Sequence, residues 1–422
     1  MPRDLWRREF VRNPYLTVSG KGSRRRLELP YFGLEINCNS RLLEIIKAFS
    51  MPRPLKTLRE ISPIEDELVM FLVHSFILLP ANEIDWLARG LLHPADNPIG
   101  SSLSWAELNS GIARGSVAVF RVPIDFAEQS VFRARGGAQK IRETLYWLSR
   151  DPETKHATGD GREVIDFDLR KTLPLRNLQV FDLGDIAFDP GIEGLDEVGK
   201  RIGKVMRCVL SQKMFPIVLG GDHSLSFYVL QEIFAAHKNV GVIHFDAHSD
   251  LYLSPYAGLD RLNHANVFQF VRRCPELRVL LQIGVRDCYA TPAEIVRVKD
   301  ERIRYISALQ MRHLTPEEVC KDLPRDIPYY ISFDVDVLDP VYAPETGTPV
   351  PGGLDLYQCL ALLDSIANTF KLVGVDFVEI GDSASPYHAT AQIVARYMVA
   401  LMINYFSANQ LDNYVFERRS TN

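Results

Sequence analysis

Aspartate and histidine alternate at the end of one apolar stretch, VIHFDAHSD, at residues Val242–Asp250. The stretch begins as a buried strand does and then places Asp246, His248 and Asp250 two residues apart. In an extended chain, side chains two residues apart point the same way, so two carboxylates and an imidazole would share one small volume. Unpaired ionised groups are costly to bury, and this crowding therefore predicts that cations lie among the side chains.

Two further apolar runs end in the same kinds of side chain. The run FPIVLG leads into GGDHS, which contains Asp222 and His223, and the run YYISF leads into Asp334 and Asp336. One such strand end is usually a turn, and we expect Asp222 itself to accept backbone N–H bonds there. Three together indicate one site, because ligands of α/β proteins gather beyond the carboxyl ends of the strands.

The side-chain types indicate which metal and which reaction to expect. Four aspartates outnumber two imidazoles and no thiolate takes part, which favours a hard divalent ion such as Mn²⁺ over a structural zinc site. Carboxylates this numerous can hold two ions that share bridging ligands. Because two cations lower the pKa of a water between them to near neutrality, the predicted reaction class is hydrolysis.

The elements that position these residues follow a repeating pattern from about Ser116 onward. Short β-branched runs alternate with amphipathic helical stretches, which is typical of a parallel sheet covered on both faces. The expected strands are SVAVFRVPI, LQVFDLGDI, FPIVLG, VGVIHFDA, LRVLLQIGV, IRYIS, YYISFDVDV and LVGVDFVEI. The expected helices include DEVGKRIGKVMRCVLSQ, SFYVLQEIFAAH and LDLYQCLALLDSIANTF. Residues 105–415 are predicted to form a three-layer α/β/α sandwich with a mainly parallel sheet, and the polar segment 150–172 a surface loop.

Composition excludes several other classes of function. The chain has 422 residues, 46% of them hydrophobic and 24% charged, as in a soluble globular protein with one large and one smaller domain. A formal charge of -5 gives no global basic field, so nucleic acid is not expected as a partner. Local basic residues near the N-terminus are most often part of a solvated tail; they are Arg7, Arg8, Arg12, Lys21, Arg24, Arg25 and Arg26.

The cysteines and the N-terminus indicate a cytoplasmic protein without a membrane segment. The N-terminal MPRDLWRREFVRN is charged where a signal peptide needs an apolar stretch, and the run LVMFLVHSFILLPA is too short to span a bilayer. No CxxC pair is present, and we expect reduced thiols at Cys38, Cys208, Cys274, Cys288, Cys320 and Cys359.

The three strand-end motifs together resemble the ureohydrolases, the family of arginase and agmatinase, and the likeness extends from VAVFRVPID to TAQIVARYM. The resemblance implies an arginase-like fold, a homo-oligomer (trimer or hexamer) and two Mn²⁺ ions that share two aspartates. The first ion would be held by His223, Asp246, Asp250 and Asp334. The second would be held by Asp246, His248, Asp334 and Asp336.

The resemblance also implies roles on the substrate side. Thr348, in the loop DPVYAPETGTPVPGG, would lie near a guanidino group, and Glu379, in DFVEI, would pair with it. A carboxylate can accept two parallel N–H bonds from a planar guanidinium ion. His264, in LNHANVF, would handle protons or orient the substrate, and Asp336 or His264 would pass a proton to the departing amine, so that urea is released. We expect His244 to be a satisfied core histidine and Asp339 a structural turn residue.

Two positions depart from arginase and argue against free arginine as the substrate. Arginase has an asparagine two residues before its loop histidine, where this chain has Leu262, with Asn263 adjacent. After GVRD, arginases place an aspartate that binds the α-amine, and this chain has Tyr289. A phenol offers an ammonium group no negative charge, so Asn263 and Tyr289 are candidates for binding a substrate whose α-groups are absent or capped.

Residues 1–104 are predicted to form a small winged-helix-like domain and linker, ahead of the catalytic domain at 105–415 and a tail at 416–422. A strand-like start precedes the helix SRLLEIIKAF, a second helix opens at Ser62 and Pro63, and the apolar FILL and the connector HPADNPIGSS follow. The arrangement resembles peptide-recognition elements that hold a leader peptide as an added strand. The alternative is an extension that only packs on the oligomer.

These observations favour a hydrolase that converts arginine to ornithine within a precursor peptide. Agmatine, a guanidino acid and guanidine also lack one or both α-groups, and each is an alternative substrate. Two other classes stay open, a catalytically silent binding protein on the same fold and a deacetylase with one zinc ion. The second fits poorly, because the paired carboxylates suffice for two ions.

Overall fold

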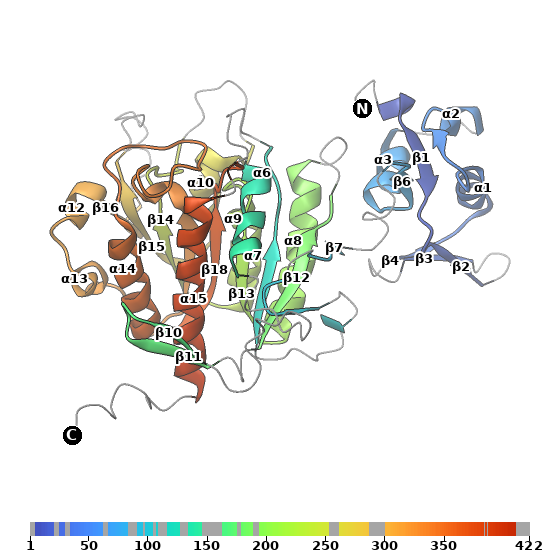
Figure 1. The fold of residues 1–422 in the computed structure, drawn as a ribbon. Coiled ribbons are helices and arrows are strands. Elements are labelled where there is room, and N and C mark those ends of the chain that lie inside the picture. Colours follow the sequence, from blue (N-terminus) through green and yellow to red (C-terminus); the bar gives the residue numbers. More distant parts are fainter. Residues whose placement is uncertain are drawn as a thin grey trace. The chain divides into compact units, whose positions relative to one another are not determined.

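The computed structural model describes residues 5–20, 25–29, 34–61, 66–82, 91–95, 98–103, 107–108, 116–126, 134–145, 163–174, 179–188, 194–252, 261–286, 300–383, 385 and 387–410. The chain divides into two compact units, coloured along the sequence in Figure 1. The first unit comprises Met1–Pro94, Ser104–Ser110 and Asp185–Arg201. The second comprises Ala95–Leu103, Gly111–Gly184 and Ile202–Asn422.

The second unit is built on a long sheet in which the strands run in the order β16-β15-β14-β17-β18-β13-β9-β12. Neighbours from β16 to β9 pair in parallel. The strands are β9 (Val117–Arg121), β12 (Val180–Ile186), β13 (Phe215–Leu219), β14 (Val240–Phe245), β15 (Leu277–Val285), β16 (Ile303–Ser307), β17 (Tyr329–Asp334) and β18 (Leu372–Val378). The short β8 (Ser101–Ser102) pairs in parallel with β12. All eight predicted strands are therefore present.

Helices cover both faces of this sheet. The helices are α6 (Ala134–Gly137), α7 (Gln139–Leu145), α8 (Leu195–Ser211), α9 (Leu225–Ala236), α10 (Val267–Val271), α12 (Ala308–Met311), α13 (Pro316–Cys320), α14 (Leu356–Thr369) and α15 (Ala389–Gln410). In Figure 1, α14 and α15 run side by side, and α15 also packs on α7. Phe333 of β17 faces this layer, with its ring centroid 5.5 Å from that of Tyr397 in α15. The neighbouring Ser332 points to the opposite face, where its hydroxyl lies 3.5 Å from that of Ser226 in α9. The predicted three-layer arrangement is confirmed.

Two elements of this unit differ from the sequence analysis. The C-terminal helix α15 was not foreseen. Within the segment expected to be a surface loop, β10 (Glu163–Asp166) and β11 (Lys171–Pro174) form an antiparallel hairpin, so that expectation was wrong for its described part. The hairpin is fixed by ion pairs, because Asp166 accepts from Arg396 of α15 at 3.2 Å and Lys171 donates to Asp364 of α14 at 2.5 Å.

The first unit contains two small antiparallel sheets and short helices. One sheet has the order β5-β1-β6 and the other β2-β3-β4. The elements are η1 (Leu5–Arg7), β1 (Glu9–Arg12), β2 (Thr17–Ser19), β3 (Arg26–Leu29), β4 (Leu34–Asn37), α1 (Ser40–Ala48), β5 (Arg53–Pro54), α2 (Thr57–Ile61), α3 (Asp66–His74), β6 (Leu78–Pro80) and β7 (Leu92–His93). This small domain is compatible with the predicted one, and the predicted helix at 40–49 is α1. The predicted helix start at Ser62 lies outside the described residues.

Two simpler expectations concern thiols and membrane segments. Five cysteines are free, and Cys288 lies outside the described residues. Among the helices that the structure describes, none combines the length and the apolar character that crossing a membrane requires.

Candidate metal centre

The carboxyl ends of three strands bring the predicted ligands together. His223 follows β13, Asp246 follows β14, and Asp334 ends β17. The register pairs Phe245 with Phe333, which sets Asp246 and Asp334 side by side on adjacent strands. The turn after β13 is tight, since a Cβ atom at Gly221 would meet the Ile124 carbonyl oxygen at 1.9 Å. Only glycine fits there.

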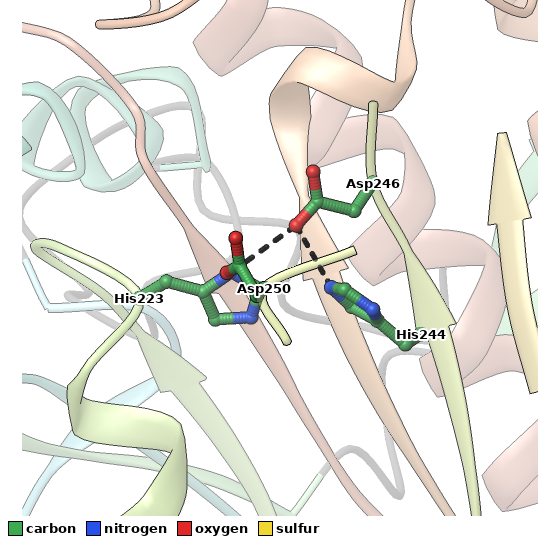
Figure 2. Close-up of side chains that lie close together, drawn as sticks. All are labelled: His223, His244, Asp246 and Asp250. Carbon is green, nitrogen blue, oxygen red and sulfur yellow. Dashed lines mark hydrogen bonds and ion pairs between the residues drawn. The ribbon is translucent and has the colours of Figure 1, made fainter. Parts of the chain in front are cut away.

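The first group of ligands surrounds the Nδ1 atom of His223. This atom lies 3.0 Å from Asp250 Oδ2, 3.3 Å from Asp334 Oδ2 and 3.4 Å from Asp246 Oδ2. Figure 2 shows His223, Asp246 and Asp250 converging, with His244 beside them. Although three carboxylate oxygens are close, Nδ1 of His223 is buried and forms no hydrogen bond of acceptable geometry. A cation between these atoms would satisfy all of them, so the residues fit a bound metal ion.

The second group of ligands surrounds His248. Its Nδ1 atom lies 2.9 Å from Asp336 Oδ2 and 3.3 Å from Asp246 Oδ1. Asp246 thus turns one oxygen to each group, as expected of a bridging ligand. We call the six residues of both groups the ligand cluster; they are His223, Asp246, His248, Asp250, Asp334 and Asp336. That these six residues bind metal stays a prediction.

The pKa values within the ligand cluster reflect its excess of negative charge. Burial, followed by the charges of Asp336 and Asp246, raises the pKa of Asp334 well above its usual value. Burial lowers the pKa of His248, but the carboxylates of Asp336 and Asp246 outweigh it and raise this pKa to about 12. Without cations, protons therefore neutralise part of the charge, and divalent ions would replace them.

A second layer of polar side chains lies one step deeper in the sheet. The register aligns Gln282, His244, Ser332 and Asp376 across β15, β14, β17 and β18. His223 Nε2 lies 2.9 Å from Ser332 Oγ, and Ser332 donates to Asp376 at 2.8 Å. Since the hydroxyl proton of Ser332 goes to Asp376, His223 must donate from Nε2, which leaves Nδ1 as the ring atom that faces the ligand cluster and could bind a cation.

His244 belongs to the same polar layer. Its Nδ1 accepts from Gln282 Nε2 at 2.8 Å, and its Nε2 therefore donates to Asp246 Oδ2 at 2.8 Å. The Phe268 ring covers it, with the centroids 4.0 Å apart. The expectation of a satisfied core histidine is confirmed, but His244 also orients a bridging ligand. This contact and the parts played by Gln282, Ser332 and Asp376 were not predicted from the sequence.

Glu379 lies just past the end of β18 and is 6% exposed. Its Oε1 accepts the backbone N–H of His223 at 2.8 Å, which places its carboxylate against the first group of ligands. Burial, and then the charge of Asp222, raise the pKa of Glu379 well above its usual value. Glu379 and Asp250 have positive φ angles of 60° and 50°, a conformation that non-glycine residues adopt rarely and often at functional sites.

The other predicted substrate residues have different surroundings. Thr348 donates from its hydroxyl to Asp336 Oδ2 at 3.2 Å, beside the second group of ligands. His264 begins the 3₁₀ helix η6 (His264–Asn266), a segment bonded to the Asp250 region through Tyr252 N–H and Ala265 C=O at 3.3 Å. Asn263 caps this helix by accepting from Ala265 N at 3.0 Å. Tyr289 lies outside the described residues.

Two aspartates and one arginine shape the loops around the site. Asp222 accepts from Phe126 N at 2.8 Å and Asp339 from Gly352 N at 2.8 Å, which confirms both as turn residues. Arg286, a further residue that the sequence analysis missed, donates to the carbonyl oxygens of Asp336 at 2.7 Å and Val350 at 2.6 Å. It thereby ties the loop before Gly353 to the second group of ligands.

Aspartates and histidines that cluster at the carboxyl ends of parallel strands can hold divalent cations, and such cations can activate water for hydrolysis. The chain matches the model of the Arginase family over residues 115–404 and belongs to this family. The predicted family, fold class and enzyme class, a hydrolase of this family, are thereby confirmed.

Individual relatives carry several names. The mitochondrial agmatinase of Gallus gallus is 32% identical over 278 residues, which cover 64% of this chain and 75% of the relative. The guanidinopropionase of Pseudomonas aeruginosa is 33% identical over an aligned region that covers 68% of this chain and 85% of the relative. Among solved structures, proclavaminate amidino hydrolase from Streptomyces clavuligerus is similar with a TM-score of 0.57 and 26% identity, covering 70% of this chain and 94% of its own.

Proposed function

We propose that the chain hydrolyses the guanidino group of a small molecule and releases urea and an amine. Relatives named agmatinase, guanidino acid hydrolase and guanidinopropionase support such a substrate, with agmatine and guanidino acids as the first candidates. Arginine within a peptide was the substrate expected from the sequence. The relatives' names lend that interpretation no support, and its small-molecule alternative is preferred.

The observation that carries the proposal is the buried carboxylate of Glu379 beside the ligand cluster. Because the backbone N–H of His223 holds Oε1 at 2.8 Å, the carboxylate is fixed before substrate arrives. A planar guanidinium ion can donate two parallel N–H bonds to it, which orients the central carbon. The positive charge of the substrate would also favour the ionised form of Glu379, whose pKa burial has raised.

Hydrolysis needs strong activation, because resonance spreads the guanidinium charge and makes its carbon a poor electrophile. We assign two Mn²⁺ ions to the ligand cluster, since its donors are carboxylates and imidazoles; when bound, they supply the nucleophile by lowering the pKa of water. Thr348 and Glu379 would hold the substrate, with His264, Asn263 and Tyr289 as further contacts. Asp336 or His264 would transfer a proton to the nitrogen of the departing amine as the C–N bond breaks.

A urea assay tests this proposal. The full-length protein with added Mn²⁺ is compared on agmatine, 3-guanidinopropionate, guanidine, free arginine and an arginine-containing peptide. We expect urea from a small guanidino compound and little from free arginine. The variant Glu379→Gln should keep its Mn²⁺ and lose urea production, because a neutral amide cannot pair with the cation as a carboxylate does.

Other results would replace the proposal. Urea from the peptide alone would restore the peptide interpretation and a recognition role for residues 1–104. Bound Mn²⁺ without urea from any compound would favour a silent binding protein, and acetate release from an acetylated amine would favour the deacetylase. The homo-oligomer, as a trimer or hexamer, stays a prediction that light scattering can check, and the cytoplasmic location one that cell fractionation can check.

A further inference from the structure

The buried carboxylate of Glu345 lies outside the ligand cluster but in the same loop as Thr348. Glu345 is 8% exposed and contacts Thr390 in the first turn of α15. Its Oε2 accepts from the backbone N–H of Thr390 at 3.0 Å and from the Thr390 hydroxyl at 2.7 Å. The backbone N–H of Glu345 in turn donates to that hydroxyl oxygen at 3.2 Å. Three hydrogen bonds thus join one residue of the loop to one residue of the helix.

The same loop is also joined to the segment that follows Glu379. The backbone N–H of Gly381 donates to the carbonyl oxygen of Glu345 at 2.9 Å. Thr346 and Ile380 form an antiparallel bridge next to this bond. Glu345 is therefore the point where the Thr348 loop, the Glu379 segment and α15 meet.

A histidine closes this junction from the helix side. His388 donates from Nε2 to the Gly381 carbonyl oxygen at 2.9 Å, because its Nδ1 accepts the backbone N–H of Ala391 at 3.2 Å. Burial acts to raise the pKa of Glu345, but the hydrogen bonds from Thr390 outweigh it and lower this pKa below its usual value. Glu345 is therefore an anion at neutral pH, which strengthens the bonds that it accepts.

Glu379 depends on such support. Its φ of 60° is unfavourable for a residue with a side chain, and it persists only where the surroundings fix the backbone. The N–H of Glu379 donates to the Gly221 carbonyl oxygen at 3.0 Å, which fixes the chain on one side. The bond between Gly381 and Glu345 fixes it two residues later.

We propose that Glu345, held by Thr390, is a positioning residue that sets the distance between Glu379 and Thr348 and thereby the affinity for the guanidino group. This inference rests on the proposed function of the site. It assigns Glu345 no contact with metal or substrate. Loss of the junction should therefore weaken substrate binding more than it changes metal content or turnover at saturation.

The test compares Glu345→Ala with Glu345→Gln, and Thr390→Val with Thr390→Ser. The alanine and valine variants lose bonds of the junction, whereas glutamine keeps an acceptor oxygen and serine keeps the hydroxyl. We expect KM to rise on the order of tenfold or more in the alanine variant, less in the valine variant, and little in the glutamine and serine variants. The kcat and the Mn²⁺ content measured by mass spectrometry should stay near wild type.

Hydrogen exchange gives a readout that does not depend on turnover. Backbone amides of residues 379–383 should exchange faster in Glu345→Ala and Thr390→Val than in wild type. In the two conservative variants their exchange rates should match wild type. If wild type releases no urea but this pattern appears, the proposed function fails, and only the role of Glu345 in fixing the Glu379 segment survives. An alanine variant with wild-type KM and wild-type exchange would overturn the inference, as would one that loses Mn²⁺ and kcat together. If Glu345→Ala does not fold, the same measurements on Thr390→Val decide the question.

Discussion

Replacing Ser332 by alanine should weaken one metal site and spare the other. The Ser332 hydroxyl accepts from His223 Nε2 at 2.9 Å and donates to Asp376 at 2.8 Å, and all three side chains are buried. Without the hydroxyl, the imidazole loses the partner that fixes its tautomer and ring angle. His248 stands in the second group of ligands, where its Nδ1 lies 2.9 Å from Asp336 Oδ2 and 3.3 Å from Asp246 Oδ1.

The expected size of the effect follows from these buried bonds. A buried donor left without a partner costs about 1–3 kcal/mol. In Ser332→Ala this cost would destabilise the orientation of His223 that can bind metal. A loss of about 1–3 kcal/mol corresponds to about 5- to 150-fold in affinity, and substitutions of residues that orient metal ligands typically cost about 10–100-fold. We therefore expect Mn²⁺ to bind about 10–100-fold more weakly at the group of His223, and nearly as in wild type at the group of His248.

Calorimetric titration of metal-free protein with Mn²⁺ measures both affinities, and metal analysis after dialysis counts the retained ions. Wild type should keep two ions and Ser332→Ala one. Ser226→Ala is the matched control, because the Ser226 hydroxyl lies 3.5 Å from the Ser332 hydroxyl, whereas Ser226 bonds to His223 through its backbone N–H, which alanine keeps. Two ions bound at wild-type affinity in Ser332→Ala would refute the reasoning. Equal loss of both ions would refute the division into two groups.

Three further predictions test other parts of the second unit. Asp246→Asn should weaken the binding of both Mn²⁺ ions in the same calorimetric titration, because each oxygen of Asp246 faces a different group of ligands. In metal-free protein the pKa of His248 is raised to about 12, so Mn²⁺ must displace a proton in order to bind. The apparent affinity for Mn²⁺ should therefore rise between about pH 6 and about pH 8. An affinity that falls over this range would contradict the assignment of His248 as a ligand. Arg142→Met should lower the free energy of unfolding by about 3–5 kcal/mol in denaturant titration, because it leaves Asp182 buried without the two bonds of 2.8 Å that Arg142 donates.

The strands and the candidate ligands could be predicted from the sequence because both follow local rules. Strands buried on both faces are almost continuously apolar, and the alternation of strand side chains placed Asp246, His248 and Asp250 together. Helix α15 lacked such a signal, because apolar residues lie on most of its sides and it packs against both α14 and α7. The hairpin at 163–174 was missed since contacts with α14 and α15, distant in sequence, hold it.

The polar layer beneath the ligand cluster had a signal that the sequence analysis did not use. Asp376 interrupts the apolar run LVGVDFV, and a carboxylate within a buried strand needs a partner. The partner could not be identified from sequence, because it depends on the register that sets Ser332 opposite Asp376. The partner of Glu345 was still harder to predict from the sequence, since Thr390 lies 45 residues further along the chain.

The register of the sheet explains how one fold can bury both a polar site and an apolar core. Along β14, β17 and β18 the row Phe245, Phe333 and Phe377 lies on the face where Phe333 meets Tyr397 of α15. The preceding row His244, Ser332 and Asp376 lies on the opposite face, where Ser332 meets α9 and His244 meets Phe268 of α10. Because side chains alternate, the next row on the α9 side contains Asp246 and Asp334. A slip of one residue in the β14–β17 pairing would separate these aspartates and leave Ser332 without His244 beside it. The aromatic row therefore does more than stabilise the core, because the packing that fixes the register also aligns the ligand cluster.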